Sequence, residues 1–302
     1  MLNFSKGNMT MPEQTRSINK SWLQINICVL LLSGTPLFAK LITLSADAIT
    51  LFRSIFGCLS LVGLIWVTKA PIRLPSCKDY ILVILTGLLT GLHWVTFFYA
   101  VQISTVAVGI LALYTFPIIT SFLEPLFDGE RMRPGNLVRA TIVFAGILLM
   151  IPEFELSNRI TAGALWGLAS ATLFSVRNIL VQKKLGHLSS TTTMCYQLVV
   201  ISLMLLPVVP FDESLAVDHR LPLLLLLGIV FTAAPHVLLV ASLRHIRATS
   251  ASLILCLHPM YSIIFAAILI SEIPSYRTML GGLMIICIAV SESIQMRRAG
   301  KQ

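Results

Sequence analysis

The chain has 302 residues, of which 56% are hydrophobic and only 12% are charged, with a formal net charge of +9 at pH 7. An ordinary soluble domain carries roughly 25% charged residues, so most of this chain's outer surface is expected to face lipid rather than water. The same composition excludes a disordered chain, a coiled coil and a secreted disulfide scaffold.

Apolar runs of about 20 residues, the length needed to cross a bilayer as a helix, follow one another along the chain. The third and fourth runs are separated only by Gln102-Ile103-Ser104, which predicts a tight hairpin between two helices. After a polar tail over residues 1–20, we predict an all-α polytopic membrane protein with ten spans: Ser21–Leu41, Asp47–Val67, Tyr80–Val101, Thr105–Phe127, Asn136–Ile151, Thr161–Gln182, Thr191–Val209, Leu221–Leu243, Thr249–Ile270 and Thr278–Met296.

Basic residues are distributed unevenly between the two sides of this arrangement. Sixteen of the 22 lie on the side that holds both termini, four lie on the other side, and Arg53 and Arg177 lie within spans. Short cytoplasmic loops carry the excess of Lys and Arg, so both termini are expected in the cytoplasm of a multi-pass protein of the plasma membrane, the inner membrane of a bacterium. The positive charge is then explained by orientation and by anionic lipid, and no nucleic-acid partner is expected.

The second half of the sequence repeats the first with an offset of 142 residues. Pro117 matches Pro259 and Glu130 matches Glu272, so each half has a proline inside its fourth helix and a glutamate 13 residues later. Each unit holds five helices, and an odd number inserts the second copy upside down. Internal repeats of this kind are typical of secondary transporters.

The stretch Ala107–Pro117, followed by Glu124, Glu130 and the small residues Ala145-Gly146, resembles the EamA domain of the drug/metabolite transporter superfamily. The stretch Thr249–Pro259, followed by Glu272 and Gly281-Gly282, is similar. The resemblance implies two inverted five-helix repeats around a central cavity, over residues 21–152 and 161–296, with a short tail over 297–302. It also implies transport of small metabolites by alternating access.

Polar side chains inside lipid are costly, so they are expected to point into the helix bundle. Helical spacing places polar stripes on six spans, whereas the second, fifth, seventh and tenth look apolar and peripheral. As substrate-binding candidates we select Lys40, His93, Tyr114, Arg177 and His236, and as a coupling carboxylate Glu124.

These residues also have simpler interpretations. Lys40, Arg53 and Arg177 lie close enough to span ends to extend toward lipid headgroups. Glu124 could pair with Arg131, and the histidines could bond a neighbouring helix.

Four prolines lie inside spans, where each removes a helical hydrogen bond, and we predict them as hinges: Pro36, Pro117, Pro235 and Pro259. Small residues at Gly146, Gly281 and Gly282 permit close helix approach, either within the fold or in a homodimer.

The hypothesis that fits best is a secondary transporter that moves a small polar or amphiphilic metabolite, with an amino acid or a related carboxylate or zwitterion as the first choice and export as the direction. A channel, receptor or membrane scaffold is the alternative. An intramembrane enzyme is not expected, because the sequence has no HExxH or GxSxG motif and no Walker motif. The six cysteines have no metal-binding spacing, so neither a metal nor a cofactor is expected.

Overall fold

A computed structural model describes residues 11–129, 134–151, 153, 155, 157–210, 220–242, 251 and 254–299. Within these ranges the chain consists of helices and their connections, without any strand. The predicted all-helical class is therefore confirmed. Glu130, which the repeat pairs with Glu272, lies outside the described residues, as do Arg131 and Ser252.

The described part of the first half contains eight helical segments: α1 (Met11–Gly34), the 3₁₀ turn η1 (Thr35–Leu37), α2 (Phe38–Leu41), α3 (Ala46–Thr68), α4 (Cys77–Ile103), α5 (Val106–Leu113), α6 (Phe116–Asp128) and α7 (Pro134–Met150). The described part of the second half contains α8 (Arg159–Lys184), α9 (Ser190–Leu205), α11 (Leu221–Gly228), the π-helical turn η3 (Ile229–Ala233), α12 (Ala234–Ser242), α14 (His258–Leu269) and α15 (Tyr276–Ala299). The predicted hairpin at Gln102-Ile103-Ser104 is confirmed, because α4 ends at Ile103 and α5 begins at Val106.

Not every apolar helix is long enough to cross a bilayer. Among the described residues six helices are, namely Asn19–Leu41, Ala46–Thr68, Cys77–Ile103, Val106–Phe127, Arg159–Lys184 and Leu221–Leu239. Four shorter apolar helices cover Gly135–Met150, Ser190–Leu205, His258–Leu269 and Tyr276–Ser291. These segments fall at the positions of the predicted spans, whereas the count of ten membrane crossings stays a prediction.

Side-chain caps explain where several helices begin. Ser45 accepts a hydrogen bond from the backbone N–H of Ala48 at the start of α3, and Ser76 forms a reciprocal capping box with Asp79 at the start of α4. Asn158 accepts from the first amides of α8. These caps satisfy amides that have no partner within the helix, so the polar breaks in the sequence set the helix starts.

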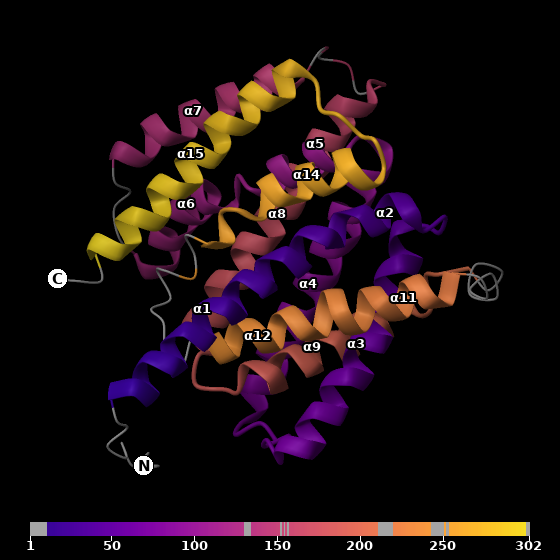
Figure 1. Ribbon diagram of the computed structural model, residues 1–302, viewed down its shortest axis with the longest axis vertical. Helices are drawn as coiled ribbons and strands as arrows, with labels where there is room; N and C mark the ends of the chain where they lie inside the picture. Colours follow the sequence, from indigo (N-terminus) through magenta and orange to yellow (C-terminus); the bar gives the residue numbers. More distant parts are fainter. Residues whose placement is uncertain are drawn as a thin grey trace.

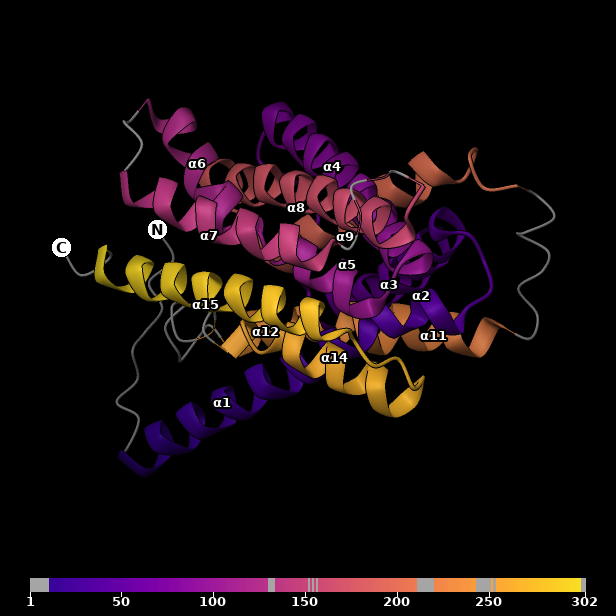
Figure 2. The same cartoon turned by 90° about the horizontal axis from the view of Figure 1, so that it is seen from above.

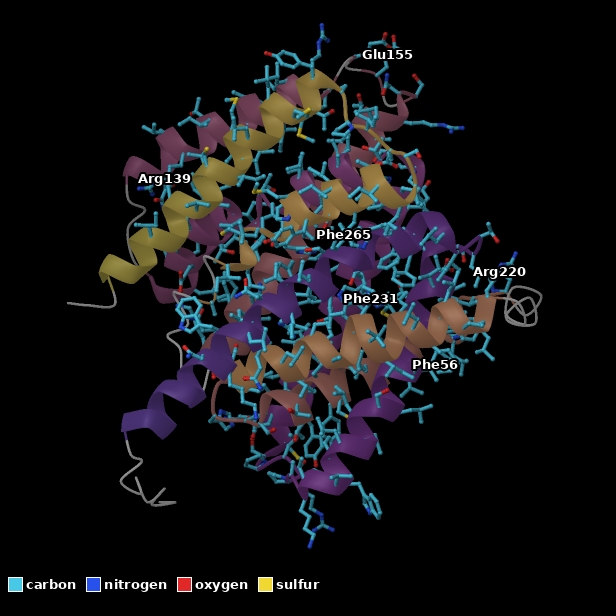
Figure 3. The ribbon with its side chains drawn as sticks, viewed as in Figure 1. Phe56, Arg139, Glu155, Arg220, Phe231 and Phe265 are labelled. Carbon is cyan, nitrogen blue, oxygen red and sulfur yellow. The ribbon has the colours of Figure 1, made fainter. Side chains whose placement is uncertain are left out.

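The two halves pack through pairs of helices, one from each half. α4 lies along α8, α1 along α12, α3 against α9 and α5 against α14 (Figure 1). α7 and α15 run antiparallel to each other at one side of the bundle (Figures 1 and 2). The first described turn of α1 and the last turn of α15 lie at the same end of the bundle (Figure 2). Arg139 lies near that end, and Glu155 and Arg220 lie toward the other (Figure 3).

Helix breaks follow the internal repeat. A turn at Tyr114-Thr115 separates α5 from α6, and a turn at Cys256-Leu257 comes directly before α14, 142 residues later. Pro117 and Pro259 occupy the second position of the helix that follows each turn. The repeat recognised in the sequence thus has a backbone counterpart.

Glycines bring α7 and α15 into close contact. A Cβ atom added to Gly146 would lie 2.8 Å from the carbonyl oxygen of Gly281, and one added to Gly281 would collide with the carbonyl of Gly146. A Cβ atom added to Gly282 would lie 2.5 Å from the side chain of Leu111 on α5. The small residues therefore serve close helix approach within the fold.

Candidate functional site

Two arginines lie in the interior of the helix bundle: Arg53 is buried and Arg177 is half-buried. We call the group formed by Arg53, Trp94, Arg177, Gln197 and Thr232 the arginine centre; its members come from α3, α4, α8, α9 and η3. Both repeats contribute to it, which is expected of a site that changes its access when two repeats move against each other.

Arg53 is only 5% exposed. Its guanidinium carbon lies 3.9 Å from the centre of the Trp94 ring, and its Nε donates a hydrogen bond of 3.2 Å to Thr232 Oγ1. Thr232 in turn donates to the carbonyl of Leu227, five residues earlier, so the π-helical turn presents this hydroxyl to Arg53. Arg53 does not extend to a headgroup, and the expectation that the second span is peripheral is wrong.

Arg177 is held by amide side chains. Its two terminal nitrogens donate to Gln197 Oε1 at 2.7 Å and Asn178 Oδ1 at 3.0 Å. Gln197, which is fully buried, donates to Thr86 Oγ1 at 2.9 Å and so ties α9 to α4. The Nε atom of Arg177 is buried without a hydrogen-bond partner in the described part of the chain. The seventh span therefore also contributes to the interior, contrary to the sequence-based expectation.

No carboxylate pairs with Arg53 or Arg177 among the described residues. A buried cation without a counter-ion is costly, and it usually marks a functional position. Glu124, the coupling candidate, forms an ion pair of 3.7 Å with Lys183 at the end of α8. It lies apart from the arginine centre, and its alternative partner Arg131 falls outside the described residues.

His93 lies beside this centre and is 5% exposed. Its Nδ1 is 2.7 Å from Ser170 Oγ, and its ring stacks on Phe174 with centroids 4.7 Å apart. Ser170 Oγ donates its proton to the His93 carbonyl, so Nδ1 must carry the proton that it shares with Ser170. The charges of both Arg177 and Arg53 act on this imidazole through space.

His236 is placed differently from the sequence-based expectation of a mid-span residue. Its Nε2 lies 3.1 Å from the carbonyl of Ser190, the first residue of α9, so the imidazole lies at a helix end. The described residues show no hydrogen bond between His236 and a member of the arginine centre.

Tyr114 belongs to a second buried cluster, in which side chains bind backbone carbonyls that prolines leave free. The Tyr114 hydroxyl donates 2.6 Å to the carbonyl of Leu255, the acceptor that Pro259 cannot serve because it has no N–H. His258 Nε2 lies 3.1 Å from the carbonyl of Leu32, which Pro36 leaves free.

The third proline of this kind is Pro235. It leaves the carbonyl of Phe231 free, and Thr35 Oγ1 donates to that carbonyl at 3.2 Å. Phe231 lies in η3, between α11 and α12 (Figure 3), and its ring packs on Phe38 with centroids 4.9 Å apart. Three of the four predicted hinges are thus satisfied by side chains from the other repeat.

Lys40 and Glu272 hold the turn between α4 and α5. Lys40 Nζ donates to the carbonyls of Gln102 at 3.2 Å and Ser104 at 2.7 Å. Glu272 Oε1 accepts from the backbone N–H of Val106 at 2.5 Å. We call these contacts the turn clamp; they give Lys40 a partner at one end of the bundle and no contact with the arginine centre among the described residues.

Sites for metal or disulfide chemistry are absent from the described residues. No group of three or more His, Cys, Asp or Glu side chains is placed to hold an ion there. The six cysteines all lie in the described ranges, and no disulfide joins any of them there.

The structure consists of two repeats of apolar helices, which meet around interior arginines and contain helix breaks at prolines. These features define a multi-pass membrane transporter. The chain belongs to the EamA-like transporter family, whose model matches residues 20–151 and again 161–291. This match confirms the two-repeat organisation.

The relatives are transporters too. The chain is 25% identical over 254 residues to the pseudopaline exporter CntI of Pseudomonas aeruginosa, covering 83% of this chain and 88% of that one. It is 25% identical to YdfC of Bacillus subtilis, an uncharacterized transporter, over 79% of this chain and 78% of that one. A solved crystal structure shares the fold with a TM-score of 0.59 at 16% identity, covering 93% of this chain and 99% of that chain.

Proposed function

We propose that this transporter exports a small metabolite that carries a carboxylate, such as an amino acid or a related acid, across the plasma membrane. We further propose that it has ten membrane crossings with both termini in the cytoplasm, and that it works by alternating access between its two repeats.

One observation carries the proposal for the substrate: two arginines lie in the interior, with Arg53 buried and Arg177 half-buried with a buried Nε, and no carboxylate neutralises them among the described residues. Arginine presents a planar set of donors that matches a carboxylate with two parallel hydrogen bonds. A bound acid would supply the missing negative charge. The free Nε of Arg177 would then gain the acceptor that it lacks.

The broken helices support alternating access. Tyr114, Thr35 and His258 join helices of opposite repeats at proline-freed carbonyls, and side-chain bonds of this kind can be exchanged as a helix bends. The direction rests on the relative whose name states that it is an exporter. The orientation rests on the excess of basic residues on the side of the termini.

Counterflow in proteoliposomes tests the proposal. Amino acids, organic acids, nucleosides and vitamins are first screened for thermal stabilisation of the purified protein, because a ligand that binds the folded state raises its stability. The stabilising compounds are then used in radiolabelled counterflow. We expect saturable exchange of a carboxylate-bearing compound that is recovered unchanged; flux at channel-like rates without saturation would favour the alternative of a channel.

Two variants sharpen this test. Arg53→Gln and Arg177→Gln should each lower the exchange rate, whereas Arg73→Gln, an exposed arginine between α3 and α4, should leave it unchanged. Reporter fusions after Lys20 and after Gln302 should both read cytoplasmic. A split between the two fusions would contradict the ten-span arrangement.

A further inference from the structure

We infer that the arginine centre takes a substrate with two anionic groups, most simply a dicarboxylate, in which Arg53 binds one carboxylate and Arg177 the other. This inference rests on the proposed function and narrows the class of substrate. It favours a dianion over a zwitterion, in which the charges of the carboxylate and the ammonium group cancel.

The two guanidinium groups lie at different depths of the bundle. His93 and Ser170 hold α4 and α8 at one level through a contact of 2.7 Å, and Arg53 lies at that level because it stacks on the adjacent Trp94. Arg177 lies seven residues beyond Ser170 on α8, about 10 Å further along that helix.

The positions of the contact residues on α4 give the same separation of the two arginines along the bundle. Arg177 bonds Gln197, and Gln197 bonds Thr86, which is seven residues before His93 on α4. Two independent helix registers therefore separate the arginines by about two helical turns, on the order of 10 Å. One carboxylate, which needs N···O distances of about 2.7–2.9 Å, cannot serve both.

Charge balance favours two anionic groups. A monocarboxylate leaves one of the two interior arginines without a counter-ion, and a zwitterion adds an ammonium group for which no carboxylate lies in the centre among the described residues. A dianion neutralises both arginines and adds no cation. In a site of low dielectric constant this difference decides which ligand is retained.

His93 offers a third contact, at the level of Arg53. Its Nδ1 carries the proton and is engaged by Ser170, so Nε2 is an acceptor, and it has no hydrogen-bond partner in the described part of the chain. A hydroxyl or N–H of the substrate close to the carboxylate that Arg53 binds would donate to this nitrogen. His93 is thus a specificity-determining residue in the proposed site.

Binding of defined probes to the full-length protein in proteoliposomes tests the inference. The probes are succinate, glutarate and adipate, compared with butyrate, pentanoate and glutamine, each by scintillation proximity or thermal shift. We expect at least one dicarboxylate to bind tenfold or more tightly than the monocarboxylate of equal length. Arg53→Gln and Arg177→Gln should each remove at least tenfold of this preference, and Arg73→Gln should keep it.

The exchange of different compounds separates this inference from the proposed function, and an electrical measurement adds a check on the charge that is moved. Net movement of a dianion carries charge, so a potassium diffusion potential set with valinomycin should change the rate of dicarboxylate efflux. If a monocarboxylate or a zwitterion shows saturable exchange at a rate equal to or above that of the dicarboxylates, the inference is wrong and the proposed transporter function is still supported. Absence of saturable exchange for every compound in the wider screen would overturn both. Monodisperse elution of each variant in detergent establishes that it is folded.

Discussion

The hydroxyl of Tyr114 donates a hydrogen bond of 2.6 Å to the backbone carbonyl of Leu255, across the boundary between the two repeats. That carbonyl is free because Pro259, four residues later, has no N–H to give it. The same hydroxyl lies 3.1 Å from His258 Nδ1, and the two rings meet edge to face. A helix break in one repeat, which we predict to be a hinge, is therefore stabilised by a side chain of the other repeat.

Tyr114→Phe should destabilise the protein by about 1–3 kcal/mol, the usual cost of leaving a buried carbonyl without a partner. The melting temperature of the purified protein in detergent measures this loss. Tyr276→Phe, at a position 75% exposed, is the matched control and should have no effect.

A double-mutant cycle measures whether the Tyr114 hydroxyl and Pro259 are energetically coupled. Pro259→Ala restores an N–H that can bind the carbonyl of Leu255 within the helix, so Tyr114→Phe should cost less in that background. Equal costs in both backgrounds would mean that the hydroxyl contributes nothing to the hinge.

Thr35 and Pro235 allow the same cycle at a second hinge. Thr35→Val keeps the side-chain shape and removes the donor to the carbonyl of Phe231, at an expected cost of about 1–3 kcal/mol that shrinks when Pro235 is replaced by Ala. Thr172→Val is the control, because the hydroxyl of Thr172 is exposed and bonds only within α8. Unfolding in detergent followed by intrinsic fluorescence supplies the four stabilities, and a coupling near zero would contradict the assignment.

The sequence predicted where helices lose a backbone hydrogen bond because a missing N–H is a property of proline itself, and the role of these prolines as hinges stays a prediction. It could not predict their partners, since Tyr114 reaches a carbonyl 141 residues away and Thr35 one that is 196 residues away. These contacts depend on how the repeats dock, and hydropathy and periodicity carry no information about docking.

Arg53 was harder to predict for a related reason. It is the lone charged residue in the middle part of an apolar helix, and the helix looked peripheral. Thr50 and Ser54 share its buried face at helical spacing, and this short polar stripe was overlooked. Its partners Trp94 and Thr232 come from two other helices. The stronger signal was the charge itself, because a cation inside a span needs a compensating interaction.

Gly281 is predicted to tolerate no side chain, because a Cβ atom there would collide with the carbonyl of Gly146. Gly281→Leu should destabilise the contact between α7 and α15 by about 1–3 kcal/mol or more, as overpacking does. Gly63→Leu is the matched control, since nothing lies within 4 Å of a Cβ atom at Gly63. Fluorescence-detected size-exclusion chromatography after a heating series should show an earlier loss of the folded peak for Gly281→Leu alone.

Glu272 should make stability depend on pH through the turn clamp. Burial raises the pKa of this carboxyl above its ordinary value of 4.5, although the hydrogen bond from Val106 and the charge of Lys40 act in the opposite direction. A group whose pKa is raised on folding contributes stability that is fully present below its unfolded pKa and is lost as the pH rises through the folded pKa.

The melting temperature of Glu272→Gln, minus that of the wild type, should therefore increase as the pH rises from about 4 through the raised pKa of Glu272. Glu153→Gln, at an exposed position, should show no such slope. A difference that is flat, or that decreases with rising pH, would mean that the attraction to Lys40 outweighs the burial of the carboxyl.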